Sequence, residues 1–402
     1  MPERSIAGGE VPGGEVYVNK ELMELHNWGQ QMRRMLRSAS VLLLVFSASL
    51  LVAETRYFDC TPAFPFQQQW QGADAAYSIP LPDGRVVWVF GDTLYGDRRI
   101  VTGEDPQMVH NTLGISTCKD RKWKIDYTIK RDEKGHYDSF FKPQNNNGTY
   151  YWALDGVEYK NELWITLLCV RNAPNSNAFA LGFEICGTDL AHVTGLDSDP
   201  QIWKVAYLPL VSEGMHANPS ASTVIEGEYL YIYTLYEKED RPQILTRIPL
   251  KELNDPKKYL QYLGGDDQWH GGIEPTKAKT IMKTGASEMS VRYHPDLTKW
   301  IAVMVHPQIF SDKVILRTAP SLTGAWTDGE VIYRIPILQK SDPKYDPDTF
   351  CYAGKEHPEF EQPGELLFTY VCNTMKPKKL VAETNIYLPQ VVRMPMPDAA
   401  KK

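Results

Sequence analysis

The sequence predicts an all-β fold, a five-bladed β-propeller. Polar or glycine-containing turns lead into β-branched and aromatic runs of strand length in five segments: 83–90, 160–168, 226–235, 297–305 and 363–371. The first residues of these runs are separated by 77, 66, 71 and 66 positions. Such a period is too long for a solenoid repeat and suits a blade of four short strands with long loops. Five copies therefore predict five blades, whose polar residues would gather around one axial pocket.

The two ends of the repeat array are expected to close the ring together. The last strand pattern, near 384–394, has no further strand after it in the sequence. We therefore predict that every blade has four strands and that residues 57–72 complete the blade begun by this last strand.

The segment before the array has the pattern of an export signal. Three arginines between positions 33 and 37 precede a 13-residue apolar run, 41–53, that ends on a small residue. This order is typical of a secretory signal peptide, and a transmembrane anchor, the alternative, needs about 20 apolar residues. We expect residues 1–53 to be an N-terminal extension plus a signal peptide and residues 54–402 to form a single propeller domain. The mature protein would be secreted or periplasmic and not held in a membrane.

Charge and cysteine content narrow the classes of partner and site. The formal net charge is −7, which argues against nucleic acid or anionic lipid as a partner. All six cysteines follow the apolar run, and an even number in an exported chain permits disulfides whose pairing the sequence leaves open. For Cys169 and Cys372, inside two of the repeated runs, a buried free thiol is an equally good interpretation. The sequence has no CxxC motif or Cys/His cluster, so no structural zinc site is expected.

Polar side chains mark the strands that are expected to line the axis. These inner strands precede the repeated runs, at 74–81, 150–159, 218–225, 287–294 and 355–360. Each has a polar side chain where the strand starts or turns: Asp74, Asp155, Asn218, Glu288, and Glu356 with His357. Acidic residues beside apolar strand residues are costly unless they are solvated, paired or functional. These residues are therefore candidates for the axial pocket.

Asp74 and Asp92 are the sharpest candidates. A hairpin centred on Asp83-Gly84 pairs positions whose numbers sum to about 166–168, so Asp74 and Asp92 come out opposite each other. Cross-strand partners lie about 4.5–5.5 Å apart at Cβ, and two carboxylates that close cannot both ionise easily. A glycosidase needs this state, with one carboxylic acid and one carboxylate. In the alternative interpretation, Asp92 caps a turn through Thr93 and Asp74 bonds to a neighbouring blade.

The other candidates each have a competing structural interpretation. Glu288 opens the inner strand of blade 4, across the axis from blade 1, and is the third candidate acid unless it only pairs with Arg292. Asp155 precedes a glycine, as in an ordinary turn, and His357 is either a sugar contact or a structural histidine. Trp152 could stack on a sugar or pack in the core. The expected substrate contacts are Trp152, Asp155, Asn218 and His357.

Three segments, 70–96, 286–304 and 352–373, resemble signatures of a known bacterial family. They are similar, in the same order, to the opening, blade 4 and blade 5 signatures of the secreted five-bladed propellers described as domain of unknown function 4185. Some members of that family are endo-D-arabinanases. The resemblance covers most of residues 57–395 and implies that the acidic pair of the family falls on Asp74 and Asp92.

We therefore predict a secreted glycoside hydrolase, in finer detail an endo-acting arabinofuranan (D-arabinan-like) hydrolase, with Asp74, Asp92 and Glu288 as catalytic residues. Its partner would be a polysaccharide or oligosaccharide, and a monomer is expected. No cofactor is required and no metal ligand set is predicted, although carboxylates from several blades could hold an axial calcium ion. The alternative is a non-catalytic carbohydrate-binding propeller, because the fold by itself implies no function.

Overall fold

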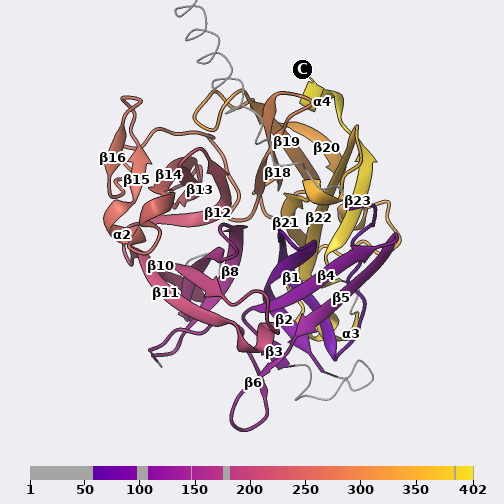
Figure 1. The fold of residues 1–402 in the computed structure, drawn as a ribbon. Coiled ribbons are helices and arrows are strands. Elements are labelled where there is room, and N and C mark those ends of the chain that lie inside the picture. Colours follow the sequence, from indigo (N-terminus) through magenta and orange to yellow (C-terminus); the bar gives the residue numbers. More distant parts are fainter. Residues whose placement is uncertain (1–57, 97–106, 146, 175–181, 384–385, 402) are drawn as a thin grey trace, which may run out of the picture. The chain divides into compact units, whose positions relative to one another are not determined.

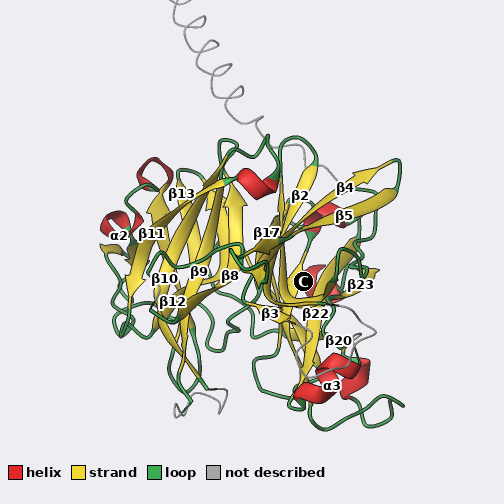
Figure 2. Cartoon of the chain, turned by 90° about the horizontal axis from the view of Figure 1, so that it is seen from below, coloured by secondary structure: helices red, strands yellow, loops and turns green. Residues whose placement is uncertain are grey.

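The computed structural model describes residues 58–96, 107–145, 147–174, 182–383 and 386–401. Contacts divide the chain into two units, Met1–Arg56 and Tyr57–Lys402, and the described residues belong to the second. This unit consists of strands joined by loops, with a few short helices (Figure 2). No helix in the described part of the chain is long and apolar enough to cross a membrane. The predicted signal segment, 41–53, lies outside the described residues.

Antiparallel sheets form five blades, which confirms the predicted all-β propeller (Figure 1). Blade 1 contains β1 (Trp70–Pro80), β2 (Arg85–Tyr95), β3 (Gln107–Val109), β4 (Thr112–Lys119) and β5 (Lys122–Thr128). Blade 2 contains β8 (Thr149–Glu158), β9 (Leu163–Asn172), β10 (Phe183–Thr194) and β11 (Lys204–Ser212). Blade 3 contains β12 (Ala217–Glu226), β13 (Tyr229–Tyr236), β14 (Gln243–Pro249), β15 (Gln261–Leu263) and β16 (Trp269–Gly271). Blade 4 contains β17 (Ser290–His294), β18 (Lys299–Val305), β19 (Lys313–Ala319) and β20 (Glu330–Arg334). Blade 5 contains β21 (Thr349–Glu356), β22 (Glu365–Thr374) and β23 (Gln390–Pro395).

Short elements connect the blades. A two-stranded ribbon joins β6 (Lys130–Arg131) to β7 (Tyr137–Asp138). The α-helices are α2 (Pro256–Tyr259), α3 (Pro377–Ala382) and α4 (Asp398–Lys401). The 3-10 helices are η1 (Pro200–Ile202), η2 (Leu250–Glu252), η3 (Pro336–Leu338) and η4 (Pro358–Phe360).

The inner strands of the five blades form a closed ring. Contacts run from β1 to β8, then to β12, β17 and β21, and from β21 back to β1. Apolar side chains fill the space between neighbouring blades: Ile79 and Val89 of blade 1, for example, share one core cluster with Ile165 and Leu167 of blade 2. Burial of this kind is the main favourable term in folding, at about 25 cal/mol per Å² of apolar surface. The polar residues of the inner strands are exceptions to this apolar packing, so their contacts have to be identified one by one.

The inner strand of blade 5 lies earlier in the chain than predicted. It was expected at 355–360, but β21 ends at Glu356 and residues Pro358–Phe360 form η4. Pro358 has no backbone N–H and a fixed φ, so the segment cannot continue the ladder. The aromatic run that starts at Thr349 forms the strand instead.

The predicted four-stranded blades and strand closure are only partly correct. Within the described residues blade 2 and blade 4 have four strands, blade 1 and blade 3 have five, and blade 5 has three. Residues 58–66 form no strand beside β23. Pro62 and Pro65 have no backbone N–H groups, which the hydrogen bonds between strands require. The two ends of the array nevertheless lie side by side, since Arg393 Nη2 donates to the carbonyl of Cys60 at 3.3 Å.

All six cysteines are paired, so the free-thiol interpretation of Cys169 and Cys372 is wrong. The disulfides are Cys60–Cys118, Cys169–Cys186 and Cys351–Cys372. Cys351 and Cys372 are direct cross-strand partners of β21 and β22. The first disulfide ties the segment that enters the propeller to β4.

Candidate functional site

Asp74 and Asp92 face each other across the first hairpin of blade 1. The ladder pairs Ala73 with Thr93, in the predicted register, and then shifts, so that Asp74 stands opposite Gly91 and Asp92. A Cβ added to Gly91 would lie 2.3 Å from Asp74 Oδ1. The absence of a side chain at this glycine therefore makes the room in which the Asp74 carboxylate lies.

An irregularity in β1 directs the Asp74 side chain. Ala75 and Ala76 have φ angles of 61° and 60°, a left-handed conformation that is uncommon for residues other than glycine. Bulges of this kind redirect side chains and are frequent beside functional sites. Three other inner strands shift register at corresponding points: Ala153 to Gly156 in β8, Pro219 to Ser222 in β12 and Tyr352 to Lys355 in β21.

Two tyrosines from the C-terminal part of the chain hold the Asp74 carboxylate. The hydroxyls of Tyr352 and Tyr387 each donate to Asp74 Oδ2 at 2.7 Å. Burial, followed by the nearby charges of Asp92 and Glu288, holds the pKa of Asp74 well above its ordinary value, and the two tyrosine bonds act in the opposite direction. The surroundings of Asp74, which include two further carboxylates, thus favour its protonated form.

Asp92 is held by two ring N–H groups. Its Oδ1 lies 3.1 Å from His110 Nδ1 and accepts a 2.9 Å hydrogen bond from Trp152 Nε1. The Asp92 side chain is 21% exposed, so a substrate can reach it. Thr93 Oγ1 donates to the carbonyl of Gly91, and the partners of the Asp92 carboxylate are His110 and Trp152. The other part of the alternative interpretation, a bond from Asp74 to a neighbouring blade, is present in its contact with Tyr352 of blade 5.

Glu288 is paired with a buried lysine and not with Arg292. Its Oε2 lies 3.4 Å from Lys355 Nζ, and its side chain is 13% exposed. Lys355 is 1% exposed, donates to the carbonyl oxygens of Ala75 and Ala353, and burial lowers its pKa. Because Ala75 follows Asp74 directly, this ammonium group links Glu288 to the irregular segment of β1.

Several residues around the carboxylates were not singled out from the sequence, among them Lys355, Tyr352, Tyr387 and His110. Lys355 stands next to Glu356 in the segment that was interpreted as an inner strand, and a lysine among apolar strand residues was the signal that could have identified it. Tyr352 and His110 had no comparable signal, because aromatic residues and histidines are common on strands and loops of such blades.

Asp155 is fully buried at the junction of three blades. It forms an ion pair with Arg292 of blade 4 at 3.3 Å and accepts hydrogen bonds from Ser222 Oγ at 3.0 Å and Thr223 N at 2.8 Å, both in blade 3. These contacts connect blades 2, 3 and 4. The predicted contact with a substrate has no support from this position, which favours a structural role.

Asn218 and His357 are also buried within protein contacts. Asn218 Nδ2 donates to Glu237 Oε1 at 2.7 Å. His357 is fully buried between Ser78 Oγ and Thr369 Oγ1, 2.6 and 2.8 Å from its ring nitrogens, and burial lowers its pKa well below the usual range. Both positions favour the structural interpretation over contact with a sugar.

Trp152 is the one predicted substrate contact that the structure brings to the carboxylates, through its bond to Asp92. Tyr150 lies beside it, stacked on His110 with ring centroids 3.6 Å apart. An imidazole and two aromatic rings thus surround Asp92. Aromatic faces of this kind are suited to packing against the apolar face of a sugar ring.

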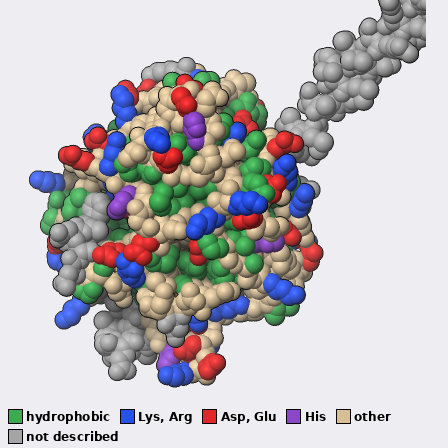
Figure 3. Space-filling view, turned by 90° about the vertical axis from the view of Figure 1, so that its left-hand side faces the viewer, with side chains coloured by type: hydrophobic (Ala, Val, Ile, Leu, Met, Phe, Trp, Pro, Cys, Tyr) green, Lys and Arg blue, Asp and Glu red, His purple; other side chains and the backbone are tan. Residues whose placement is uncertain are grey.

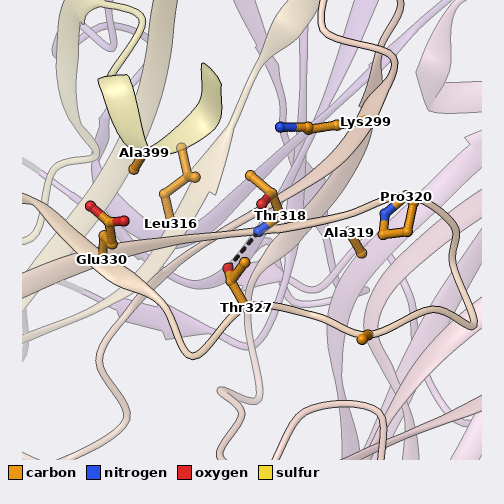
Figure 4. A pocket seen from close by; sticks show the side chains of 9 residues that line it. Lys299, Leu316, Thr318, Ala319, Pro320, Thr327, Glu330 and Ala399 are labelled. Atoms are coloured by element: carbon orange, nitrogen blue, oxygen red, sulfur yellow. Dashed lines mark hydrogen bonds between the residues drawn. The ribbon is translucent and has the colours of Figure 1, made fainter. Parts of the chain in front are cut away.

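A separate surface cavity of about 430 Å³ lies on blade 4 beside α4 (Figure 4). Lys299, Leu316 and Glu330 are among its lining residues, and Thr327 Oγ1 accepts a 3.0 Å hydrogen bond from Thr318 N in its wall. None of the three candidate catalytic carboxylates lines it. Since Glu330 is the one acidic residue among its lining residues, this cavity lacks the paired carboxylates that glycoside hydrolysis needs.

One group of side chains in the described part of the chain could hold a metal ion. His294, Glu356 and Glu361 bring one nitrogen and two oxygen ligand atoms within 4.8 Å of one another. This group is distinct from Asp74, Asp92 and Glu288.

The charged side chains on one side of the molecule are of both signs and interspersed (Figure 3).

Comparisons with known proteins bear on the family and the fold. A family model described as "Domain of unknown function (DUF5005)" matches residues 62–395. It is not the model of the family that the motifs resemble, so that finer resemblance stays a prediction. No curated protein matches the chain.

Two solved structures show the similarity found among known folds. A protein from Bacteroides ovatus ATCC 8483, described as a candidate hydrolase, is similar with a TM-score of 0.62 and 17% identity over 80% of this chain and 85% of that one. An exo-1,5-α-L-arabinanase from a bovine ruminal metagenomic library has a TM-score of 0.42 and 11% identity over 82% of this chain and 95% of its own. At these identities the likeness concerns the fold, and the chemistry has to be argued from the site.

Proposed function

The chain belongs to the family described as Domain of unknown function (DUF5005), and we propose that it is a glycoside hydrolase that uses Asp74, Asp92 and Glu288. The opposition of Asp74 and Asp92 across one hairpin is the observation that supports this proposal most strongly. Glu288 is close enough to contribute to the raised pKa of Asp74. Carboxylates whose environments push their pKa values apart are the groups from which glycosidases build an acid and a base.

Asp74 is the proton donor in this proposal. Its raised pKa keeps it protonated where an ordinary aspartic acid would be ionised. Tyr352 and Tyr387 both donate to Oδ2, which leaves Oδ1 as the atom that carries the proton. A carboxylic acid held in this way can protonate the glycosidic oxygen as the bond to the leaving sugar breaks.

Asp92 is the ionised partner. Oδ1 accepts a hydrogen bond from the Trp152 indole and lies 3.1 Å from His110 Nδ1, so Oδ2 is left to face the substrate. Because cross-strand neighbours are close, the pair favours the retaining route, in which the carboxyl groups are about 5–5.5 Å apart and the second acts as nucleophile. Glu288, beside the Lys355 ammonium, would stabilise the positive charge that develops on the sugar ring.

An arabinofuranose polymer is the substrate class we propose, with D-arabinan as the first candidate. The support is the resemblance of segments 70–96, 286–304 and 352–373 to a family with endo-D-arabinanase members. Three disulfides suit an oxidising compartment and support the proposed export of the chain, with no further cofactor required for hydrolysis.

The purified wild-type protein tests this function directly. We expect it to release reducing ends from D-arabinan and to leave pyranose polymers such as xylan and galactan uncut. Proton NMR of the first product is expected to show the anomeric configuration of the substrate. Binding of a glycan without cleavage of any polymer would instead establish the carbohydrate-binding alternative.

A further inference from the structure

A second cluster of ionisable side chains lies at the other ends of β17 and β21. His294 is the last residue of β17 and Glu356 is the last residue of β21, while Glu361 follows η4. Glu288 precedes the first residue of β17, Ser290, whereas His294 is the last, so Glu288 and the cluster are at opposite ends of this strand. Tyr352, which holds Asp74, precedes Glu356 by four residues on β21, with a register shift between them. The cluster is therefore separate from the carboxylates of the proposed active site.

The ligand atoms of this cluster converge. One atom from each of His294, Glu356 and Glu361 lies within 4.8 Å of the other two. His294 Nε2 and Glu356 Oε1 are 2.5 Å apart, and Glu361 Oε1 accepts a hydrogen bond from Leu367 N at 2.8 Å. The His294 side chain is 11% exposed, so an ion has an entry at the imidazole.

One oxygen of the cluster lacks a partner. Glu356 is 1% exposed, and its Oε2 has no hydrogen-bond partner among the described residues. Oε1 of the neighbouring Glu359 also has no hydrogen-bond partner among the described residues. A buried carboxylate oxygen without a donor is expensive, and such groups in proteins are as a rule paired or bound to a metal.

Acidic side chains predominate around the cluster. Four buried carboxylates, those of Asp155, Glu356, Glu359 and Glu361, lie near Arg292 and His294, and Lys355 directly precedes Glu356. Arg292 is hydrogen-bonded to Asp155, and Lys355 is paired with Glu288. His294 is therefore the cationic side chain that pairs with the cluster carboxylates, and a bound cation would add positive charge there.

We propose that His294, Glu356 and Glu361 bind one Zn²⁺ ion. Zinc takes imidazole nitrogen and carboxylate oxygen together, with three protein ligands and a fourth position for water. Calcium takes six to eight oxygens, which a buried group with one nitrogen and two carboxylates does not offer. The proton between His294 and Glu356 leaves when the ion enters, so binding releases protons and weakens in acid. Because the ligands come from blades 4 and 5, the ion would cross-link them.

Titration calorimetry with ZnCl₂ on the metal-free full chain at neutral pH tests this site. We expect one ion per chain for the wild type, and weaker binding of CaCl₂ by at least about 100-fold. Glu361→Gln keeps the shape of the side chain and removes one ligand charge, so it should weaken zinc binding by about 100-fold or more, since even groups behind the ligands contribute 10–100-fold. His294→Ala should do the same.

His270→Ala is the matched control, because His270 pairs with Asp266 in an exposed position that could collect zinc adventitiously. This variant should bind zinc as the wild type does. Zinc should also raise the melting temperature of the wild type and of His270→Ala but not that of Glu361→Gln. A wild type that binds no zinc at one equivalent, or a Glu361→Gln variant that binds it unchanged, would overturn the proposal.

Discussion

Tyr352 and Asp74 are 278 positions apart in the sequence and are joined by a 2.7 Å hydrogen bond from the tyrosine hydroxyl to Oδ2. Tyr352 is in the inner strand of the last blade and Asp74 is in that of the first. The contact therefore places the proposed proton donor at the junction where the ring of blades closes.

Asp74→Asn and Asp92→Asn should each lower the rate of arabinan hydrolysis by about 10²–10⁴-fold or more, because general acid–base catalysis contributes a factor of this size. Each variant should melt near the temperature of the wild type, since the amide keeps the shape of the carboxyl group and Asp74 is already the uncharged member of the pair in this proposal. Reducing-sugar release and thermal melts measure the two effects. Asp398→Asn, at an exposed position near the C-terminus, is the control. Activity within threefold of wild type in either variant would refute the catalytic assignment.

Tyr352→Phe should shift the alkaline limb of the pH–rate profile to higher pH. The tyrosine hydroxyl stabilises the ionised form of Asp74 and so lowers its pKa. Removing this donor raises the pKa of Asp74 further, and a proton donor loses activity as the pH rises through its pKa. Profiles of kcat/KM against pH measure the shift. Tyr387→Phe should act in the same direction, whereas an unmoved alkaline limb in both variants would show that Asp74 is not the acid.

Gly91→Ala should displace the Asp74 carboxylate. The new Cβ would lie 2.3 Å from Oδ1, so the side chain or the strand has to move. Overpacking of this kind costs about 1–3 kcal/mol of stability, and we expect a loss of kcat with it. Gly271→Ala is the control, because nothing lies within 4 Å of a Cβ at that position. Denaturant melts and initial rates that match the wild type would contradict the geometry assigned to Gly91.

Asp155→Asn should destabilise the fold without a direct effect on substrate binding. Removing one partner of a buried ion pair leaves the Arg292 charge uncompensated, at a cost of about 3–5 kcal/mol. Urea denaturation measures this loss, and KM of the folded fraction should stay within threefold of wild type. A raised KM with unchanged stability would instead restore the predicted role of Asp155 as a substrate contact.

The architecture was predictable because each blade repeats one local pattern. The turn at Asp83-Gly84 fixes the register of the first hairpin, and this register alone placed Asp74 opposite Asp92. Both inferences need only residues that are near one another in the sequence.

The surroundings of the pair were not predictable by the same means. Tyr352, Lys355 and Glu288 reach Asp74 from blades that follow it by more than 200 positions, and only the closed ring decides which of their side chains meet. Glu288 illustrates this, because the neighbour four residues away, Arg292, was the natural partner from the sequence. In the structure Arg292 turns to the buried Asp155 of another blade, and Lys355 takes its place beside Glu288.

The tyrosine bonds from the C-terminal region to Asp74 make the proposed catalysis depend on the order in which the chain is made. A nascent chain that has completed the first four blades already contains Asp74, Asp92 and Glu288 but neither Tyr352 nor Tyr387. Its proposed acid would lack both tyrosine donors. The chain would therefore be inert during synthesis and become active only when the last blade docks, so that activity reports complete folding.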